Sequence, residues 1–430
     1  MTYSNTFNNI SDIAPEALDV LTNSLTFSRT VSRKYNKAWE RMGGKIGDTF
    51  NIRVPGYFNR VAGAGAVPGG YNDTAVPVVL SQYNSSVVFT SKEMTLNVDD
   101  MKRNVLNPLL EPIWEGIDTD GLALVNTGVY QWAGTPGTSI TTLTPFLQAK
   151  ATMEMQSSKP SGQDCNGALN PFMQATMLGN FPAYFNPQAE LGKDIIKGEL
   201  GTYAGIKYFT TANIPAHTTG SFASASPTVA ASPAISNATG YTSIATASWG
   251  SNSAYVLKIG DSITISGVYA WNPANRSNSG ILRQFTVVGG SAVGTQPVND
   301  GSGNMTLLLN PPMVATGATQ NVSALPTGTG NAIYVWGDAS ANKNATLSTA
   351  IVSPTSLAFY EDAFTLAIAD LEDVNNQGGA ESIRIRDPRT NLNLRLTKWY
   401  DGIADQGILR ADVLYGWAAP RPGFAARVVE

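Results

Sequence analysis

The chain of 430 residues has a single cysteine, Cys165, and a single histidine, His217. One cysteine excludes an intrachain disulfide framework and a cysteine-cluster metal site. One histidine excludes zinc sites built on histidine pairs and most catalysis that uses histidine. The surrounding sequences, SGQDCNGAL and IPAHTTG, predict a structural cysteine that is buried or half-exposed and a surface histidine in a loop. We therefore expect no catalytic residue, no bound metal and no cofactor.

Charge and long apolar runs are also scarce. Charged residues make up 14% of the chain, against a usual share of about 25%. The net charge of −4 argues against a general polyanion-binding protein, which needs a concentrated basic surface. No run reaches the roughly 18 apolar residues of a membrane span, and residues 1–9 lack the regions of a signal peptide. These absences predict a soluble chain, made in a reducing cytoplasm, without a membrane partner.

The few charges are unevenly distributed. Residues 221–345 are rich in Ser, Ala, Thr, Gly and Asn, and short β-type runs alternate there with turn residues. We predict an all-β domain inserted into another fold, with residues 221–253 forming an entry segment and one or two weak strands. The charged residues of this block are Lys258, Asp261, Arg276, Arg283, Asp300, Asp338 and Lys343, and its predicted strands are 256–268, 285–288, 305–309 and 333–336.

The N-terminal region changes the sign of its charge along the sequence. Residues 12–25 predict a short helix, in which Asp12, Glu16 and Asp19 share one face. A basic segment follows between residues 29 and 45. Two solvated faces or a binding surface explain this pattern equally well.

Residues 46–90 predict a long two-stranded arm. The strands are residues 49–55 and 76–88, on either side of the glycine-rich residues 61–71. Because a two-stranded ribbon is only marginally stable alone, we expect the arm to lie on the rest of this chain or on a neighbour.

The strongest helical period of the chain follows this arm. Apolar residues recur three or four positions apart from Val98 to Ile117, which predicts a helix from a cap at Asn97 to about Leu124. Pro108 predicts a kink or a restart of that helix. After the inserted block, residues 359–371 predict another helix. Residues 383–386, 392–399 and 408–417 predict strands of one α+β fold whose sheet is built from late segments.

Motifs that carry chemistry are missing. The sequence has neither a phosphate-binding loop nor a dinucleotide-binding fingerprint. Helix capping or a polar loop explains the carboxylate pairs, since acid–base catalysis would need perturbed pKa values in a pocket. A basic cluster near the late strands predicts cross-strand ion pairs or a weak contact with nucleic acid. The pairs are Asp99 with Asp100, Asp118 with Asp120, and Glu361 with Asp362; the basic cluster is Arg384, Arg386, Arg389 and Arg395.

Five segments, taken in order, carry a resemblance to a known family. The chain resembles the major capsid proteins of tailed bacteriophages with the Hong Kong 97-type fold. It is most similar to the coat-protein branch of short-tailed Salmonella phages, which has an inserted β-barrel domain. The segments are FTSKEMTLNVDDMKRNVLNPLL (89–110), FNPQAELGKDI (185–195), LKIGDSITISGV (257–268), SLAFYEDAF (356–364) and LRADVLYGWAAPRPGFAARVV (409–429).

The resemblance implies an α+β capsid fold divided into parts. Such a protein would form hexamers and pentamers of an icosahedral head around double-stranded DNA, be assembled in the host bacterial cytoplasm and reside in the virion. The implied parts are an N-terminal helical arm (1–45), an extended loop (46–95), a spine helix with a peripheral domain (96–165), an axial and peripheral segment (166–220), an inserted antiparallel β-barrel (221–345), and an axial sheet with the C-terminal segment (346–430).

The resemblance also implies partners and roles for residues. Scaffolding protein, portal protein, a decoration or cement protein and weakly held DNA would be the partners. The acidic face of Asp12, Glu16 and Asp19 would meet a basic scaffold, and the loop arginines Arg53 and Arg60 would contact the next subunit. Gly47, Ser91 and Pro108 would be hinges during shell expansion. Some family members cross-link subunits through a lysine of the extended loop; because residues 46–91 contain none, we expect a non-covalent shell.

Two other functions are compatible with parts of the sequence. A tail-tube, fibre or adhesin protein would explain the Ser/Thr/Gly-rich β block, but it fits the long helix poorly. A carbohydrate-active enzyme would explain the eight tryptophans, but it needs a carboxylate pair in a cleft.

Overall fold

The computed structural model shows a mixed α and β protein with few helices and many strands. It divides into two compact units, each described by itself: the first comprises residues 1–52, 75–121 and 364–418, and the second comprises residues 53–74, 122–363 and 419–430. The described residues are 15, 17, 18, 21, 25–33, 49–54, 56, 74–90, 105–157, 162–180, 201–221, 226–237, 240–250, 257–317, 319–337, 350–374, 380–386 and 392–430.

The longest helix is α4, Asn107–Gly128, and its residues up to Gly121 belong to the first unit. Leu109, Ile113 and Ile117 are buried along one face, as the helical period predicts. Pro108 is the second residue of α4, where its fixed φ and missing N–H suit a first turn. The predicted kink or restart at Pro108 stays a prediction, because residues 105 and 106 are already helical and the residues before them are outside the described part of the chain. The helix ends four residues beyond the predicted Leu124, and residues 97–104 lie outside the described part of the chain.

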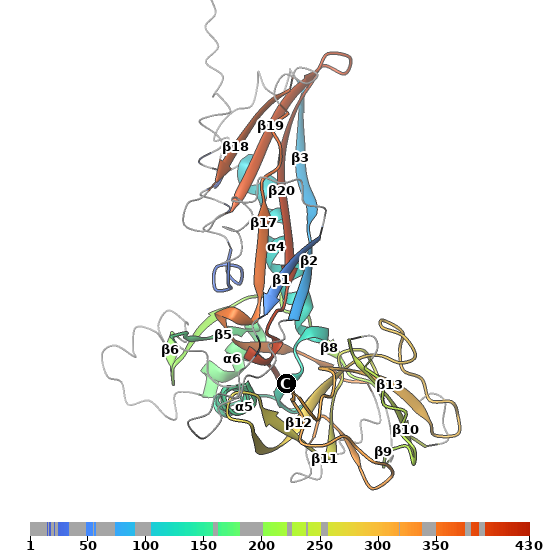
Figure 1. The fold of residues 1–430 in the computed structure, drawn as a ribbon. Coiled ribbons are helices and arrows are strands. Elements are labelled where there is room, and N and C mark those ends of the chain that lie inside the picture. Colours follow the sequence, from blue (N-terminus) through green and yellow to red (C-terminus); the bar gives the residue numbers. More distant parts are fainter. Residues whose placement is uncertain are drawn as a thin grey trace, which may run out of the picture. The chain divides into compact units, whose positions relative to one another are not determined.

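A five-stranded antiparallel sheet, here called the long sheet, completes the first unit. Its longest strand, β20, pairs with β3 from Gln406 opposite Thr90 to Tyr415 opposite Ser81. Figure 1 shows β18, β19, β20 and β3 running side by side. The strands are β3 (Ser81–Thr90), β17 (Thr365–Ala369), β18 (Glu381–Arg386), β19 (Asn393–Asp401) and β20 (Gln406–Ala418).

The predicted arm is only partly a separate ribbon. Strands β1 (Thr49–Val54) and β2 (Thr74–Val79) pair as expected. The expected second strand, 76–88, is broken near Leu80, and its later part is β3 of the long sheet. The physical reason is a change of partner: β2 pairs with β1, whereas β3 pairs with β20 along its whole length.

The N-terminal segment lies against the long sheet within the first unit. Pro15, Ala17, Leu18 and Leu21 are helical, and the last three are buried. Ser32 forms a parallel bridge with Thr365 at the start of β17.

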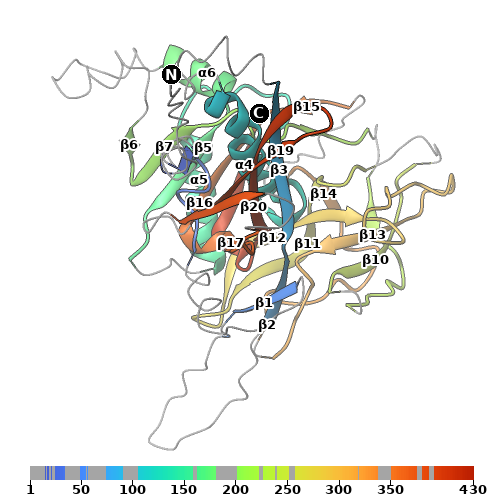
Figure 2. The ribbon, with the colours of Figure 1, turned by 90° about the horizontal axis from the view of Figure 1, so that it is seen from above.

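The second unit contains a mixed sheet in the order β4-β21-β16-β5-β7-β6. Helix α5 (Thr144–Ser157) packs against β4 and β21, and α6 (Pro171–Asn180) follows β5 (Figure 2). The strands are β4 (Gln131–Gly134), β5 (Cys165–Leu169), β6 (Thr202–Tyr203), β7 (Ile206–Thr210), β16 (Thr355–Tyr360) and β21 (Ala425–Val429); β8 (His217–Thr218) pairs separately with β15 (Val352–Ser353), and the 3-10 turns are Glu361–Ala363 and Pro422–Phe424.

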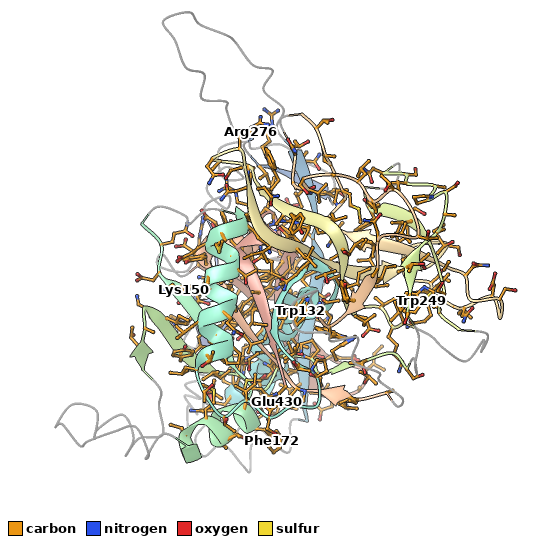
Figure 3. All side chains as sticks on the ribbon, turned by 90° about the horizontal axis from the view of Figure 1, so that it is seen from below. Trp132, Lys150, Phe172, Trp249, Arg276 and Glu430 are labelled. Carbon is orange, nitrogen blue, oxygen red and sulfur yellow. The ribbon has the colours of Figure 1, made fainter. Side chains whose placement is uncertain are left out.

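Six strands between residues 228 and 335 form a second sheet of this unit, here called the antiparallel sheet. Their order is β14-β11-β12-β13-β10-β9. An antiparallel bridge between Thr228 and Ala332 joins its first and last strands. Its buried core includes Trp249 and also Trp132 of β4, both labelled in Figure 3. The strands are β9 (Thr228–Val229), β10 (Thr242–Ala247), β11 (Ser262–Asn272), β12 (Ser277–Gly289), β13 (Met305–Asn310) and β14 (Ile333–Val335).

One expectation for the late segments is wrong and another is confirmed. Residues 359–371 are not a helix: β16 ends at Tyr360, a 3-10 turn follows at Glu361–Ala363, and β17 begins at Thr365. Both strands are almost continuously buried, and a continuous apolar run does not distinguish a buried strand from a buried helix. The strands expected at 383–386, 392–399 and 408–417 are confirmed as parts of one sheet, because β18, β19 and β20 all belong to the long sheet.

Candidate functional site

Most residues predicted to contact partners or to act as hinges lie outside the described part of the chain. These are Asp12, Glu16, Asp19, Gly47, Arg60 and Ser91. Arg53 is described, and its side chain is exposed on β1. Pro108 is in the first turn of α4. Of the predicted contact and hinge residues, the structure thus describes Arg53 and Pro108.

The basic cluster of the late strands is engaged in ion pairs within the long sheet. Arg384 of β18 pairs with Asp373 at 2.8 Å. Arg395 of β19 and Arg410 of β20 pair with Asp412 at 3.0 and 2.7 Å, and Gln82 donates a further hydrogen bond to the same carboxylate at 3.0 Å. Asp412 is fully buried, so these donors offset the cost of burying its charge.

A pocket of about 430 Å³ opens over these strands. Its lining contains three arginines and three aspartates, so their formal charges cancel. Cross-strand ion pairing thus explains Arg395, Arg384 pairs with Asp373 in the segment between β17 and β18, and Arg389 lies outside the described residues. The charged lining residues are Arg384, Arg386, Arg395, Asp370, Asp373 and Asp412.

The carboxylate pair on α4 has a structural use. Asp118 is buried and accepts hydrogen bonds of 2.9–3.1 Å from the backbone N–H groups of Thr26, Phe27 and Ser28, and one from the Thr26 hydroxyl. Phe27 then stacks on Trp417 with ring centroids 5.4 Å apart. A carboxylate of α4 thus fixes the N-terminal segment to the first unit.

Its neighbour Asp120 accepts a hydrogen bond from the Tyr415 hydroxyl at 2.7 Å. Burial raises the pKa of Tyr415 well above its ordinary value, and the hydrogen bond to Asp120 raises that pKa further. Tyr83 of β3 stacks on the Tyr415 ring at 4.7 Å. Both carboxylates of this pair therefore act as hydrogen-bond acceptors that hold the first unit together.

The lone histidine is not on the surface, which corrects the sequence expectation. His217 is 4% exposed, and its Nε2 lies 2.9 Å from Oδ1 of Asp261. Asp261 also accepts hydrogen bonds from the indole N–H of Trp336 and from the backbone N–H groups of Gly220 and Lys258. The polar sequence IPAHTTG gave no sign of this burial, because the partner lies 44 residues away.

Arg427 of β21 completes this buried group, and sequence reasoning missed it. Its side chain is 0% exposed and donates to the Gly260 carbonyl at 2.7 Å and to the hydroxyls of Ser262 and Thr286. Its guanidinium lies 5.2 Å from the centre of the Trp336 ring. Burial lowers the pKa of Arg427 to about 10, and the negative charge of Asp261 opposes that shift.

The remaining chemical candidates are structural. Cys165 is buried in β5, as the sequence predicts. Glu361 and Asp362 lie in the 3-10 turn between β16 and β17. Among the described residues, no group of three His, Cys, Asp or Glu side chains is arranged to hold a metal ion. Over the same residues, no helix is both long and apolar enough to cross a membrane.

No protein-family profile and no curated protein sequence matches the chain. Similar solved structures include one described as Mycobacterium phage Che8, at 8% identity and a TM-score of 0.43, covering 94% of this chain and 91% of that one. The capsid structure of the cyanophage P-SCSP1u matches at 11% identity and a TM-score of 0.40, covering 89% and 83% of the two chains. A virus-like particle from Pyrococcus furiosus matches at 7% identity and a TM-score of 0.39, covering 96% of both chains. Because these scores are below 0.5, we infer the function from the chain's own elements.

Proposed function

We propose that the chain is the major capsid protein of a tailed bacteriophage, and that its copies form an icosahedral head around double-stranded DNA. The order of parts along the chain supports this proposal. An N-terminal segment, a two-stranded ribbon and the long helix α4 come first, a second unit with two sheets follows, and the chain then returns to complete the long sheet. This is the order that the sequence resemblance implies.

The chemistry of the described residues is compatible with a protein that acts by binding other copies of itself. Asp118, Asp412 and Asp261, the buried carboxylates described above, are each occupied by several hydrogen-bond donors. A shell closes through many modest contacts between copies, and an isolated surface ion pair contributes only about 0–1 kcal/mol. In this proposal Arg53 and Arg60 act through their repetition at every subunit interface.

The finer assignments belong to the same proposal. The N-arm (1–45), extended loop (46–95), spine and peripheral segments (96–220), inserted β-barrel (221–345) and axial segment (346–430) follow the family pattern. The bridge between Thr228 and Ala332 supports a closed barrel. The proposal also includes scaffold-assisted assembly into hexamers and pentamers, and contacts with portal and decoration proteins. Expansion of the shell would use Gly47, Ser91 and Pro108 as hinges.

Negative-stain electron microscopy of the expressed chain, alone and with its scaffolding protein, tests the proposal. We expect closed shells or curved shell fragments. Tubes would indicate a tail-tube protein, and trimeric rods would indicate a fibre. A monodisperse monomer would show that the chain does not assemble. Each of these three results would overturn the capsid assignment. Denaturing gels of assembled particles should show only the monomer, because residues 46–91 contain no lysine, and a ladder of multimers would contradict this.

Charge reversal tests the scaffold contact separately. Changing Asp12, Glu16 and Asp19 to lysine should lower the scaffold content and the yield of procapsids. The control is Glu111→Lys, which adds positive charge at an exposed position of α4. Unchanged scaffold content in the triple variant would remove the proposed contact, while leaving the capsid function intact.

A further inference from the structure

The two sheets of the second unit share a buried boundary. Gln284 of β12 makes two hydrogen bonds with the backbone of Trp132 in β4, each of 3.0 Å. The Thr286 hydroxyl donates to the carbonyl of Val129 at 3.1 Å. Trp132 and Val429 lie in the same apolar cluster as the core of the antiparallel sheet. The antiparallel sheet therefore completes its core with residues from outside its own segment.

The charged centre of this boundary comes from three separate segments. Asp261 stands immediately before β11, His217 forms part of β8, and Arg427 lies in β21. Arg427 reaches the carbonyl of Gly260, the hydroxyl of Ser262 at the start of β11 and the hydroxyl of Thr286 in β12. One side chain thus holds two neighbouring strands of the antiparallel sheet to a strand of the mixed sheet.

The backbone at Trp336 indicates how firmly this centre is fixed. Trp336 has a φ of +49°, which is unfavourable for a bulky residue. Its ring is held by the hydrogen bond to Asp261, by the guanidinium of Arg427, and by Trp132 with ring centroids 5.4 Å apart. Contacts to the centre therefore maintain an unfavourable backbone conformation at the residue that follows β14.

We propose that Arg427 locks the antiparallel sheet closed onto the mixed sheet, so that folding of the antiparallel sheet depends on a strand that is distant in sequence. β21 begins 90 residues after the end of β14. The antiparallel sheet consequently reaches its final state only when β21 has paired with β16. This lock rests on contacts within the second unit and does not depend on the proposed capsid function.

The energetic reason is the carboxylate of Asp261, which is 0% exposed. The guanidinium of Arg427 donates to the Gly260 carbonyl and to the Ser262 hydroxyl, on either side of Asp261 in the sequence, and so places a buried positive charge beside that carboxylate without a direct hydrogen bond to it. Removing the guanidinium is destabilising because three buried acceptors lose their donor and the nearby buried carboxylate loses a compensating positive charge. Removal of both charges is much less harmful, since no charge then remains buried.

Hydrogen–deuterium exchange on the full chain tests the lock. Arg427→Met keeps an extended apolar side chain but removes the charge and the donors. We expect amide protection in β11 and β12 to fall roughly 10- to 100-fold, the range for losing hydrogen bonds from a charged donor, while the long sheet keeps its protection. Arg395→Met is the matched control: it also leaves a buried aspartate, Asp412, and should lower protection only in the long sheet.

The double variant Asp261→Asn with Arg427→Met keeps the test decisive where the single variant unfolds. If the lock acts through the buried charge, the double variant recovers at least part of the protection that Arg427→Met loses. Unchanged protection of β11 and β12 in Arg427→Met would overturn the proposal. So would a double variant that is no better protected than Arg427→Met.

Discussion

Two glycines of α4 should respond to the same substitution in opposite directions. A Cβ atom at Gly121 would lie 2.7 Å from two carbons of the Trp417 indole. At Gly116, the nearest side-chain atom to such a Cβ is the hydroxyl of Tyr415, at 3.9 Å. Both positions are inside one helix, so the gain in helix propensity on going from Gly to Ala is similar, about 0.5–1 kcal/mol.

The surroundings of Trp417 decide the sign at Gly121. Trp417 is stacked on Phe27, which is fully buried and packs edge-on against Phe364 at 5.5 Å. The indole therefore cannot move aside without displacing a second ring. Overpacking of this kind costs about 1–3 kcal/mol. We expect Gly121→Ala to destabilise the first unit by about 1–2 kcal/mol, and Gly116→Ala to stabilise it by about 0.5–1 kcal/mol.

Native-state hydrogen exchange of α4 and β20 measures the change in the free energy of unfolding for each glycine variant. Every 1.4 kcal/mol changes the protection factor tenfold. A second change, Trp417→Phe, makes room for the new methyl group, so the double variant should be less destabilised than the sum of the single effects. The reasoning would be refuted if Gly121→Ala were as well protected as the unmodified chain, or if Gly116→Ala lost protection.

Two further changes test the first unit. Asp118→Ala leaves several hydrogen-bond donors of residues 26–28 unpaired, and each buried unpaired donor costs about 1–3 kcal/mol of stability. The rate of hydrogen exchange should therefore rise sharply over residues 25–33. Unchanged exchange there would contradict the role of this carboxylate. The raised pKa of Tyr415 means that the folded chain keeps the phenol proton above about pH 10, where the unfolded chain loses it. Stability should be fully present below that pH and should fall as the pH rises, and urea midpoints of Tyr415→Phe should fall less steeply than those of the unmodified chain. Equal slopes would refute this account.

Local pattern was sufficient for much of the chain. The helical period predicts α4, because apolar residues three and four apart form one buried face whatever they pack against. The alternation in residues 408–417 likewise predicts β20. In the antiparallel sheet, glycine, asparagine and proline turns separate most of the strands that the structure contains.

The sequence by itself determined where side chains alternate, where helices begin and which chemistry is scarce, because those properties depend on neighbours along the chain. Only the tertiary structure decided which partner each segment meets. Residues 359–371 became two strands because the mixed sheet and the long sheet bury them on both sides of a 3-10 turn. His217 and Arg427 became buried because Asp261 and the edge of the antiparallel sheet surround them. Contacts between residues 44 to 167 positions apart leave no local pattern, so the buried centre of the second unit could be found only in three dimensions.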